Sequence, residues 1–247
     1  MQTDVVLTVA EGKRLIGKGI AADEVVQRAL TAGTVAVTTG TTNGYVIEEL
    51  SGEEFAKYHY VTGNTMPSTY SGEKPDYTMQ DYVARENERV DMSAVDAVSE
   101  MSAGDVFLKG VNAINYEKAQ AGVLIGHPEG GTVGKTLGRI ISQQIQLIHP
   151  VGLEKSVPID LNCAASHLAD PDVKAPSLWV VPGRIFTEVE ALKTLADVSA
   201  VPIGAGGICG AEGAVRLLLK GERKALEKAH HIIEEVQGEP EFEGSDG

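Results

Sequence analysis

A run of hydroxyl and amide side chains between glycines is the part of the sequence best suited to binding chemistry. It reads Thr38-Thr-Gly-Thr-Thr-Asn-Gly44 and follows the β-prone segment 34–37. Backbone N–H groups at the start of a helix, joined by hydroxyl donors, attract anions, and glycine lets a ligand approach the backbone closely. The alternative is a polar turn whose threonines only cap a helix. The pattern predicts an anion-binding turn built from Thr39, Gly40, Thr41, Thr42 and Asn43.

A second group of polar residues accompanies two short apolar segments, 93–98 and 105–108. We expect both segments to be buried strands, and ligands of open α/β sheets bind at the carboxyl ends of strands. A carboxylate there can move a proton, and a lysine can polarise a carbonyl or hold a phosphate. Ordinary surface charges are the alternative. The sequence predicts catalytic roles for Asp96, Lys109 and Glu117 and ligand binding by Gly110 and Asn112.

A glycine-rich turn, Gly126-His-Pro-Glu-Gly-Gly-Thr-Val-Gly-Lys-Thr136, nearly matches a phosphate-binding P-loop. The first glycine of that motif is replaced by Glu129, whose carboxylate repels phosphate. A P-loop-like nucleotide site is therefore the less favoured interpretation, and a plain loop is another. We expect the amides of Gly130, Gly131 and Thr132 to face the same cleft as the threonine turn.

Composition excludes several classes of protein. The chain has 247 residues, 43% hydrophobic and 23% charged, which is typical of a folded globular protein. The net charge of −14 without a Lys/Arg block argues against nucleic-acid binding. An apolar run long enough for a membrane span and a secretory leader are both missing, so a cytoplasmic protein is expected. The two cysteines are predicted in the core, and neither a metal site nor a cofactor is expected.

The hydrophobic periodicity of the first part predicts alternating helices and strands. We expect a helix over 10–32, with a possible break at residues 17–19 and an end at Gly33, and a helix that ends at Gly52. The stretch 58–92 reads as an irregular lid or subunit contact, so a homo-oligomer is expected. Further predicted elements are the strands 34–37, 93–98, 105–108 and 121–126 and a helix over 137–148.

The second part of the chain predicts a smaller α+β unit. Its strands are expected at 177–181, 200–203 and 214–219, with helices over 187–198 and 222–237. This βαββα order is typical of a ferredoxin-like layer, with residues 201–208 read as a hairpin turn. The predicted organisation is α/β: a Rossmann-like three-layer parallel-sheet domain over 1–155, a ferredoxin-like subdomain over 156–238, and an acidic disordered tail over 239–247.

The threonine turn and the group around Lys109 together resemble a superfamily of metabolic enzymes. It comprises the A-type ribose-5-phosphate isomerases, the glucosamine-6-phosphate deaminases and the CoA transferases. Its helix, strand, Gly-Thr-Gly-Ser/Thr-Thr turn and helix correspond to residues 11–50. The isomerases' V-D-G-A-D-E segment corresponds to VDAVSE (95–100), and their Lys-Gly-Gly-Gly to Arg-Glu-Lys stretch to residues 109–118. The resemblance covers residues 10–125.

The resemblance implies a small anionic ligand, either a sugar phosphate or an acyl/CoA-type metabolite, and an isomerase-like or transferase-like enzyme. Three departures bear on the reaction. Ser99 replaces the second acid, Val111 and Asn112 interrupt the glycines, and the stretch to Glu117 is one residue shorter. A non-catalytic metabolite-binding or sensing protein of the same fold is the alternative, and Ser99 favours it.

Overall fold

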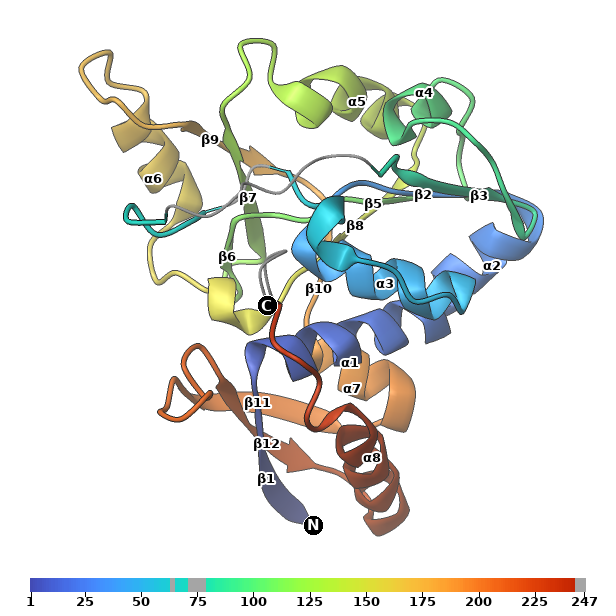
Figure 1. Ribbon diagram of the computed structural model, residues 1–247, viewed down its shortest axis with the longest axis vertical. Helices are drawn as coiled ribbons and strands as arrows, with labels where there is room; N and C mark the ends of the chain where they lie inside the picture. Colours follow the sequence, from blue (N-terminus) through green and yellow to red (C-terminus); the bar gives the residue numbers. More distant parts are fainter. Residues whose placement is uncertain (63–64, 71–78, 243–247) are drawn as a thin grey trace.

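The computed structural model describes residues 1–62, 65–70 and 79–242 and has a mixed α/β fold (Figure 1). Its largest sheet has the strand order β10-β8-β5-β2-β3-β4. Four neighbouring strands of this sheet run parallel: β10 (Arg184–Phe186), β8 (Gln146–Pro150), β5 (Val106–Leu108) and β2 (Thr34–Val37). The antiparallel strands β3 (Tyr82–Arg85) and β4 (Glu88–Arg89) complete one edge.

Helices cover both faces of this sheet because its strands are apolar on both sides. Val35 and Val37 belong to one buried cluster, whereas Ala36 and Phe107 belong to another. The second cluster includes side chains of α4 (Ala94–Val98) and α5 (Gly131–Ser142), which lie on one face (Figure 1). On the other face lie α1 (Val9–Ala22), α2 (Glu24–Ala32) and α3 (Thr41–Ser51), and α7 (Glu188–Ala196) packs against α1.

The N-terminal helical segment is broken at a different residue from the one predicted. Helix α1 begins with a capping box between Thr8 and Glu11 and runs through Gly17 and Gly19 to Ala22. Asp23 then ends α1, and its side chain accepts hydrogen bonds from the first amides of α2. The glycine at 19 is needed for packing, since a Cβ there would lie 2.7 Å from the Cα of Ala191 on α7. Gly33 ends α2, as predicted.

Two three-stranded antiparallel sheets flank the large sheet. One consists of β6 (Ala113–Asn115), β7 (Gln120–Ile125) and β9 (Ser177–Val181), next to α6 (Leu161–Leu168). The other consists of β1 (Gln2–Leu7), β12 (Val215–Lys220) and β11 (Ser199–Ala205). Helix α7 contacts β11 and α8 (Arg223–Val236) beside this second sheet (Figure 1).

The predicted βαββα group is therefore wrong in its first strand. Strand β9 pairs with β7 instead of joining β11 and β12, and the N-terminal strand β1 takes a place beside β12. Strands β11 and β12 form the predicted hairpin, but the turn predicted over 201–208 is misplaced, because residues 201–205 belong to β11. The pairs β1–β12, β7–β9 and β8–β10 all cross the predicted domain boundary near residue 155, so the two sides of that position share sheets.

Several local predictions also need correction. Segment 93–98 contains the short helix α4, because the Ser93 hydroxyl accepts a hydrogen bond from the amide of Asp96. The helix predicted over 137–148 ends at Ser142, and its last residues belong to β8. The stretch 58–92 holds the short 3-10 helix η1 (Lys57–Tyr60) and strands β3 and β4, while its residues 63–64 and 71–78 lie outside the described residues.

The termini and cysteines differ from expectation as well. Cys163 and Cys209 are exposed, not buried in the core. The start of the predicted disordered tail packs against α1, where Glu239 pairs with Arg14 at 2.9 Å and the Phe242 ring lies 5.5 Å from Lys13 Nζ. Residues 243–247 lie outside the described residues. Among the helices that the structure describes, none is long and apolar enough to cross a membrane.

Candidate functional site

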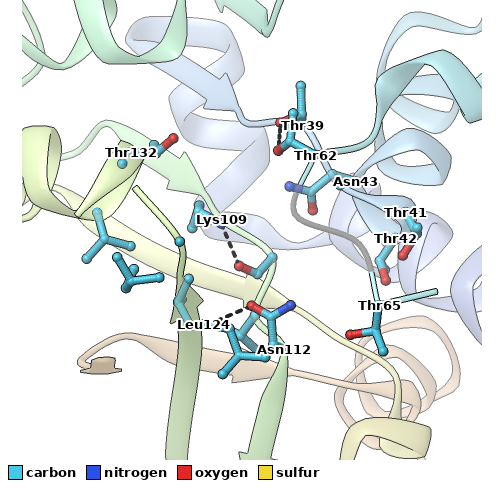
Figure 2. A pocket seen from close by; sticks show the side chains of 18 of the residues that line it. Thr39, Thr41, Thr42, Asn43, Thr62, Thr65, Lys109, Asn112, Leu124 and Thr132 are labelled. Atoms are coloured by element: carbon cyan, nitrogen blue, oxygen red, sulfur yellow. Dashed lines mark hydrogen bonds between the residues drawn. The ribbon is translucent and has the colours of Figure 1, made fainter. Parts of the chain in front are cut away.

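A cavity of about 720 Å³ lies where β2 and β5 end and where α3 and α5 begin (Figure 2). We call it the central cavity. Its wall is formed by residues 39–43, 109–112, 123–127 and 130–133 and by Lys13, Thr62, Thr65 and Lys155. Of the described residues that form this wall, none is an aspartate or glutamate and three are lysines. The central cavity is therefore a site of positive charge in an acidic protein, and its size suits a small metabolite.

The start of α3 forms one wall of the cavity. The chain leaves β2 beside β5, where both the amide and the hydroxyl of Thr38 donate to the carbonyl of Leu108. Gly40 is the N-cap residue of this helix and has no side chain. The first helical amides therefore receive no capping acceptor from residue 40. Together with the positive end of the helix dipole, these amides are suited to hold an anion.

Two buried polar atoms at this helix start lack a partner within the described part of the chain. Thr42 is 2% exposed and Asn43 is fully buried, yet Thr42 Oγ1 and Asn43 Oδ1 have no hydrogen bond. The orientation of the Asn43 amide is fixed, because its Nδ2 donates to the carbonyl of Thr38 at 2.8 Å. Buried polar atoms are normally paired. These two offer a hydroxyl donor to an anion and a carbonyl acceptor to a ligand hydroxyl.

A half-buried carboxylate, Asp81, holds this turn in place. Asp81 accepts hydrogen bonds from the amide of Thr39 at 3.1 Å and from the amide of Ala94 at 2.9 Å, and so joins the threonine turn to the start of α4. Burial raises the pKa of Asp81, and these two hydrogen bonds oppose the rise. The sequence did not single out this residue, because it belongs to the stretch predicted as irregular.

The glycine-rich turn reaches the same cavity as the start of α5. Gly130 precedes the helix in a left-handed conformation, with φ +77°, and provides no side-chain cap. Lys135 is exposed and lies outside the cavity wall, while the Thr136 hydroxyl donates to the carbonyl of Thr132 at 2.7 Å. The lysine and threonine of the P-loop-like motif thus do not reach the cavity. His127, which does line it, accepts a hydrogen bond from the amide of Glu129.

Three lysines from distant parts of the chain provide the positive charge. Lys13 lies on α1, Lys109 follows β5, and Lys155 lies on the short 3-10 helix η2 (Leu153–Lys155). Lys109 Nζ donates to the carbonyl of Gly110 at 2.9 Å, and Lys155 Nζ donates to the carbonyl of Val111 at 3.2 Å. Burial lowers the pKa of all three lysines, and with the charge of Lys155 it lowers the pKa of Lys109 to about 8.

The structure brings most of the predicted site residues together. Lys109 lines the central cavity with every predicted ligand-binding residue: Thr39, Gly40, Thr41, Thr42, Asn43, Gly110, Asn112, Gly130, Gly131 and Thr132. Asp96 and Glu117 do not line it. Asp96 is exposed on α4, where it accepts a hydrogen bond from the Ser93 hydroxyl, and Glu117 is exposed in the turn between β6 and β7. Their assignment as proton-transfer groups of this cavity is corrected accordingly.

The sequence interpretation missed Lys13, Lys155 and the threonines at 62 and 65. Lys13 had a recognisable signal, because it lies three residues from both Ala10 and Ile16 on the buried face of α1. Lys155 follows Leu153 in an irregular segment, where no periodicity indicates which side chains turn inward.

A buried glutamate lies close to Lys13. Glu188, at the start of α7, is 2% exposed and accepts a hydrogen bond from the amide of Leu153 at 3.0 Å. Gly12 gives it room, since a Cβ at position 12 would lie 2.6 Å from Glu188 Oε1. Burial, with a smaller contribution from Glu154, raises the pKa of Glu188 to about 8. The carboxyl group therefore carries a proton at neutral pH.

The Glu188→Gln substitution is expected to flatten the pH dependence of stability. Between its ordinary pKa of 4.5 and its folded pKa of about 8, Glu188 keeps a proton that the unfolded chain has lost. Stability contributed by this group is thus present at acid pH and declines as the pH rises through that window. From about pH 6 to about pH 7.5 the native chain should lose about 2 kcal/mol that the glutamine variant retains.

Urea unfolding of both proteins at the two pH values measures this difference. The exposed Glu227→Gln on α8 is the matched control and should leave the native pH dependence unchanged. Parallel pH profiles for the native chain and the Glu188 variant would show that the carboxyl group is ionised in the folded protein.

Comparison of the chain with protein-family models, with curated proteins and with solved structures finds no match. The function must therefore be inferred from the chemistry of the central cavity.

Proposed function

We propose that the central cavity binds a small metabolite that carries an anionic group and hydroxyl groups, as a sugar phosphate does. The observation that carries this proposal is the pair of buried atoms at the start of α3 that have no hydrogen-bond partner among the residues that the structure describes. Thr42 Oγ1 can donate to an anion, and Asn43 Oδ1 can accept from a hydroxyl. An acyl/CoA-type ligand satisfies the positive charge of the cavity equally well, but it makes less use of the Asn43 acceptor.

Charge supports the same ligand class. Lys13, Lys109 and Lys155 line the cavity without a carboxylate among the described lining residues. A bound anion restores the balance, and each hydrogen bond that it receives from a charged group contributes about 1.5–3 kcal/mol. The uncapped start of α3 adds backbone donors of fixed direction.

The proposal also includes a Rossmann-like fold and a distant relationship to the sugar-phosphate isomerases and CoA transferases. Parallel strands β2, β5, β8 and β10 with helices on both faces favour a Rossmann-like three-layer arrangement, with the cavity at the carboxyl ends of β2 and β5. The threonine turn and Lys109 line one cavity, which suits the resemblance to the sugar-phosphate isomerases and CoA transferases.

Catalysis is the less constrained part of the proposal. An isomerase-like or transferase-like reaction needs a group in the cavity wall that accepts a proton or attacks a carbonyl. Asp96 and Glu117 lie outside that wall, which favours a non-catalytic binding protein as the second candidate. Lys109 is the lining residue suited to an enzymatic role, because burial lowers the pKa of its amine to about 8.

Thermal unfolding in the presence of ribose 5-phosphate, ribose and inorganic phosphate tests the binding proposal. Both phosphates should raise the melting temperature, because a ligand that binds the folded state stabilises it by RT ln(1 + [L]/Kd). Ribose 5-phosphate should act at lower concentration than inorganic phosphate, since only the sugar offers hydroxyls to Asn43. No stabilisation by either phosphate would contradict the proposal.

The Thr42→Val substitution is expected to weaken ribose 5-phosphate binding about tenfold. It removes the hydroxyl donor while preserving the shape of the side chain, and a lost hydrogen bond to an anion costs about 1.5 kcal/mol or more. Isothermal titration calorimetry provides the comparison. The matched control is Thr31→Val on α2, an exposed threonine whose hydroxyl bonds to the carbonyl of Gln27, and it should bind like the native chain. Equal affinity for Thr42→Val and the control would remove Thr42 from the site.

A further inference from the structure

Lys109 combines a backbone held by hydrogen bonds with a side chain in the wall of the central cavity. Its backbone N–H donates to the carbonyl of Ile148 at 3.0 Å, and its own carbonyl lies 2.7 Å from His149 Nδ1. Its side chain lies in the wall of the central cavity (Figure 2). Within the described part of the chain, the ion pairs do not include Lys109, and Nζ donates to the carbonyl of the adjacent Gly110.

Burial is the main cause that lowers the pKa of Lys109, and the charge of Lys155 adds to it. His149, whose Nδ1 lies 2.7 Å from the Lys109 carbonyl, is itself buried, and burial lowers its pKa. Asp81 is the opposing carboxylate, but both of its oxygens accept hydrogen bonds from backbone amides of Thr39 and Ala94. A lysine that is desolvated and close to a second cation is the type of amine that attacks carbonyl carbons in proteins.

Lys109 is also next to the predicted anion site. The amide and hydroxyl of Thr38 both donate to the carbonyl of Leu108, at 3.0 and 3.2 Å. Lys109 is the next residue after Leu108, and Thr39 is the next residue after Thr38. The lysine and the threonine turn therefore leave adjacent strands side by side and enter the same cavity (Figure 2).

We propose that Lys109 is a nucleophile that forms an imine with the carbonyl carbon of a phosphorylated aldehyde or ketone held at the start of α3. This inference rests on the proposed function and narrows its ligand to a carbonyl compound. The other two lysines of the cavity are less suited to the role. Lys13 lies over the ring of Phe242, and Lys155 reaches the cavity from η2 instead of from a strand beside the threonine turn.

The reaction needs no further reactant. The lone pair of the neutral Lys109 amine forms a bond to the carbonyl carbon, and the π electrons of the carbonyl move to its oxygen. A proton passes from nitrogen to that oxygen to give a carbinolamine. The nitrogen lone pair then forms the C=N bond as the C–O bond breaks, and the hydroxyl group leaves as water with the proton that the nitrogen still carried. Amine and carbonyl thus become imine and water, and hydrolysis reverses both steps.

Trapping with sodium borohydride tests the inference on the full chain. The protein is incubated with glycolaldehyde phosphate and reduced, and the modified lysine is located by peptide mass spectrometry. We expect one principal adduct, on Lys109, formed at least about tenfold faster than with unphosphorylated glycolaldehyde. Inorganic phosphate should slow it by competing for the start of α3. The Lys109→Arg variant keeps the charge without the nucleophile and should give no adduct at position 109.

Each other outcome separates this inference from the proposed function. If inorganic phosphate stabilises the native chain but Lys109 remains unmodified, the inference is overturned and the anion site stands. An adduct mainly on Lys13 or Lys155, or labelling spread over exposed lysines such as Lys228, also overturns it. If ribose 5-phosphate and inorganic phosphate both fail to stabilise the protein and Lys109 is not labelled, the proposed function is itself contradicted, and the inference falls with it. Because the native chain itself is mapped, the result does not depend on the folding of the arginine variant.

Discussion

Replacing Gly40 with aspartate is expected to weaken phosphate binding by about two to three orders of magnitude without destabilising the protein. The backbone at Gly40 is extended, with φ 161°, and a Cβ there would meet Asn43 atoms at ordinary distances of 3.7–3.8 Å. The new carboxylate can accept from the first amides of α3 as an internal cap. Two anions about 4–5 Å apart near a protein surface repel by about 3–4 kcal/mol, which sets the size of the loss.

The Gly40→Asn variant separates the effect of the aspartate's charge from the effect of the space that its side chain occupies. It supplies a neutral cap of the same size, so it should weaken binding much less than aspartate does, while both variants unfold within about 1 kcal/mol of the native chain. Calorimetric titration with inorganic phosphate and urea unfolding measure the two quantities. Native affinity in the aspartate variant would place the anion elsewhere in the protein.

The His149→Leu substitution is expected to cost about 1–3 kcal/mol of folding stability. His149 is fully buried on β8, with Nδ1 2.7 Å from the Lys109 carbonyl and Nε2 2.8 Å from the Pro182 carbonyl. Burial lowers the pKa of His149, although both hydrogen bonds oppose this shift. A neutral imidazole has one N–H and donates to one of these two carbonyls, so leucine, which has a similar size, removes that donor at a cost of about 1–3 kcal/mol.

The ring also sets the path of the chain from β9 to β10. Gly183, with φ +134°, follows Pro182, and a Cβ at this position would lie 2.5 Å from His149 Nε2. The His149→Asn variant keeps a donor that reaches the Lys109 carbonyl, so it should recover part of the stability lost in the leucine variant. Urea unfolding compares the three proteins. A leucine variant within about 0.5 kcal/mol of the native chain would show that these contacts do not support the fold.

The threonine turn could be predicted from the sequence because its signal is local. A β-prone segment, a glycine and hydroxyl-bearing residues at a helix start specify the turn and the polar groups that it presents within a few positions. The same holds for Gly130–Thr132, where two glycines precede an amphipathic helix. Both turns line one cavity because parallel strands bring their carboxyl ends together.

The remaining features depend on contacts between distant segments. The apolar residues of 93–98 suggested a strand, but the Ser93 cap and burial on a single side make this segment a helix whose Asp96 faces solvent. Strand β9 fits either small sheet by pattern alone, and its pairing with β7 is decided by tertiary packing. The lysines at 13 and 155 reach the cavity from segments separated by most of the chain, which no local spacing encodes.

The most direct test of the anion site is an amide NMR titration of the isotopically labelled protein with ribose 5-phosphate. We expect saturable shifts that are largest at the backbone amides of Thr41, Thr42 and Asn43, with smaller shifts at Gly110 and Thr132. Shifts centred on residues outside the central cavity, or none at saturating ligand, would contradict it.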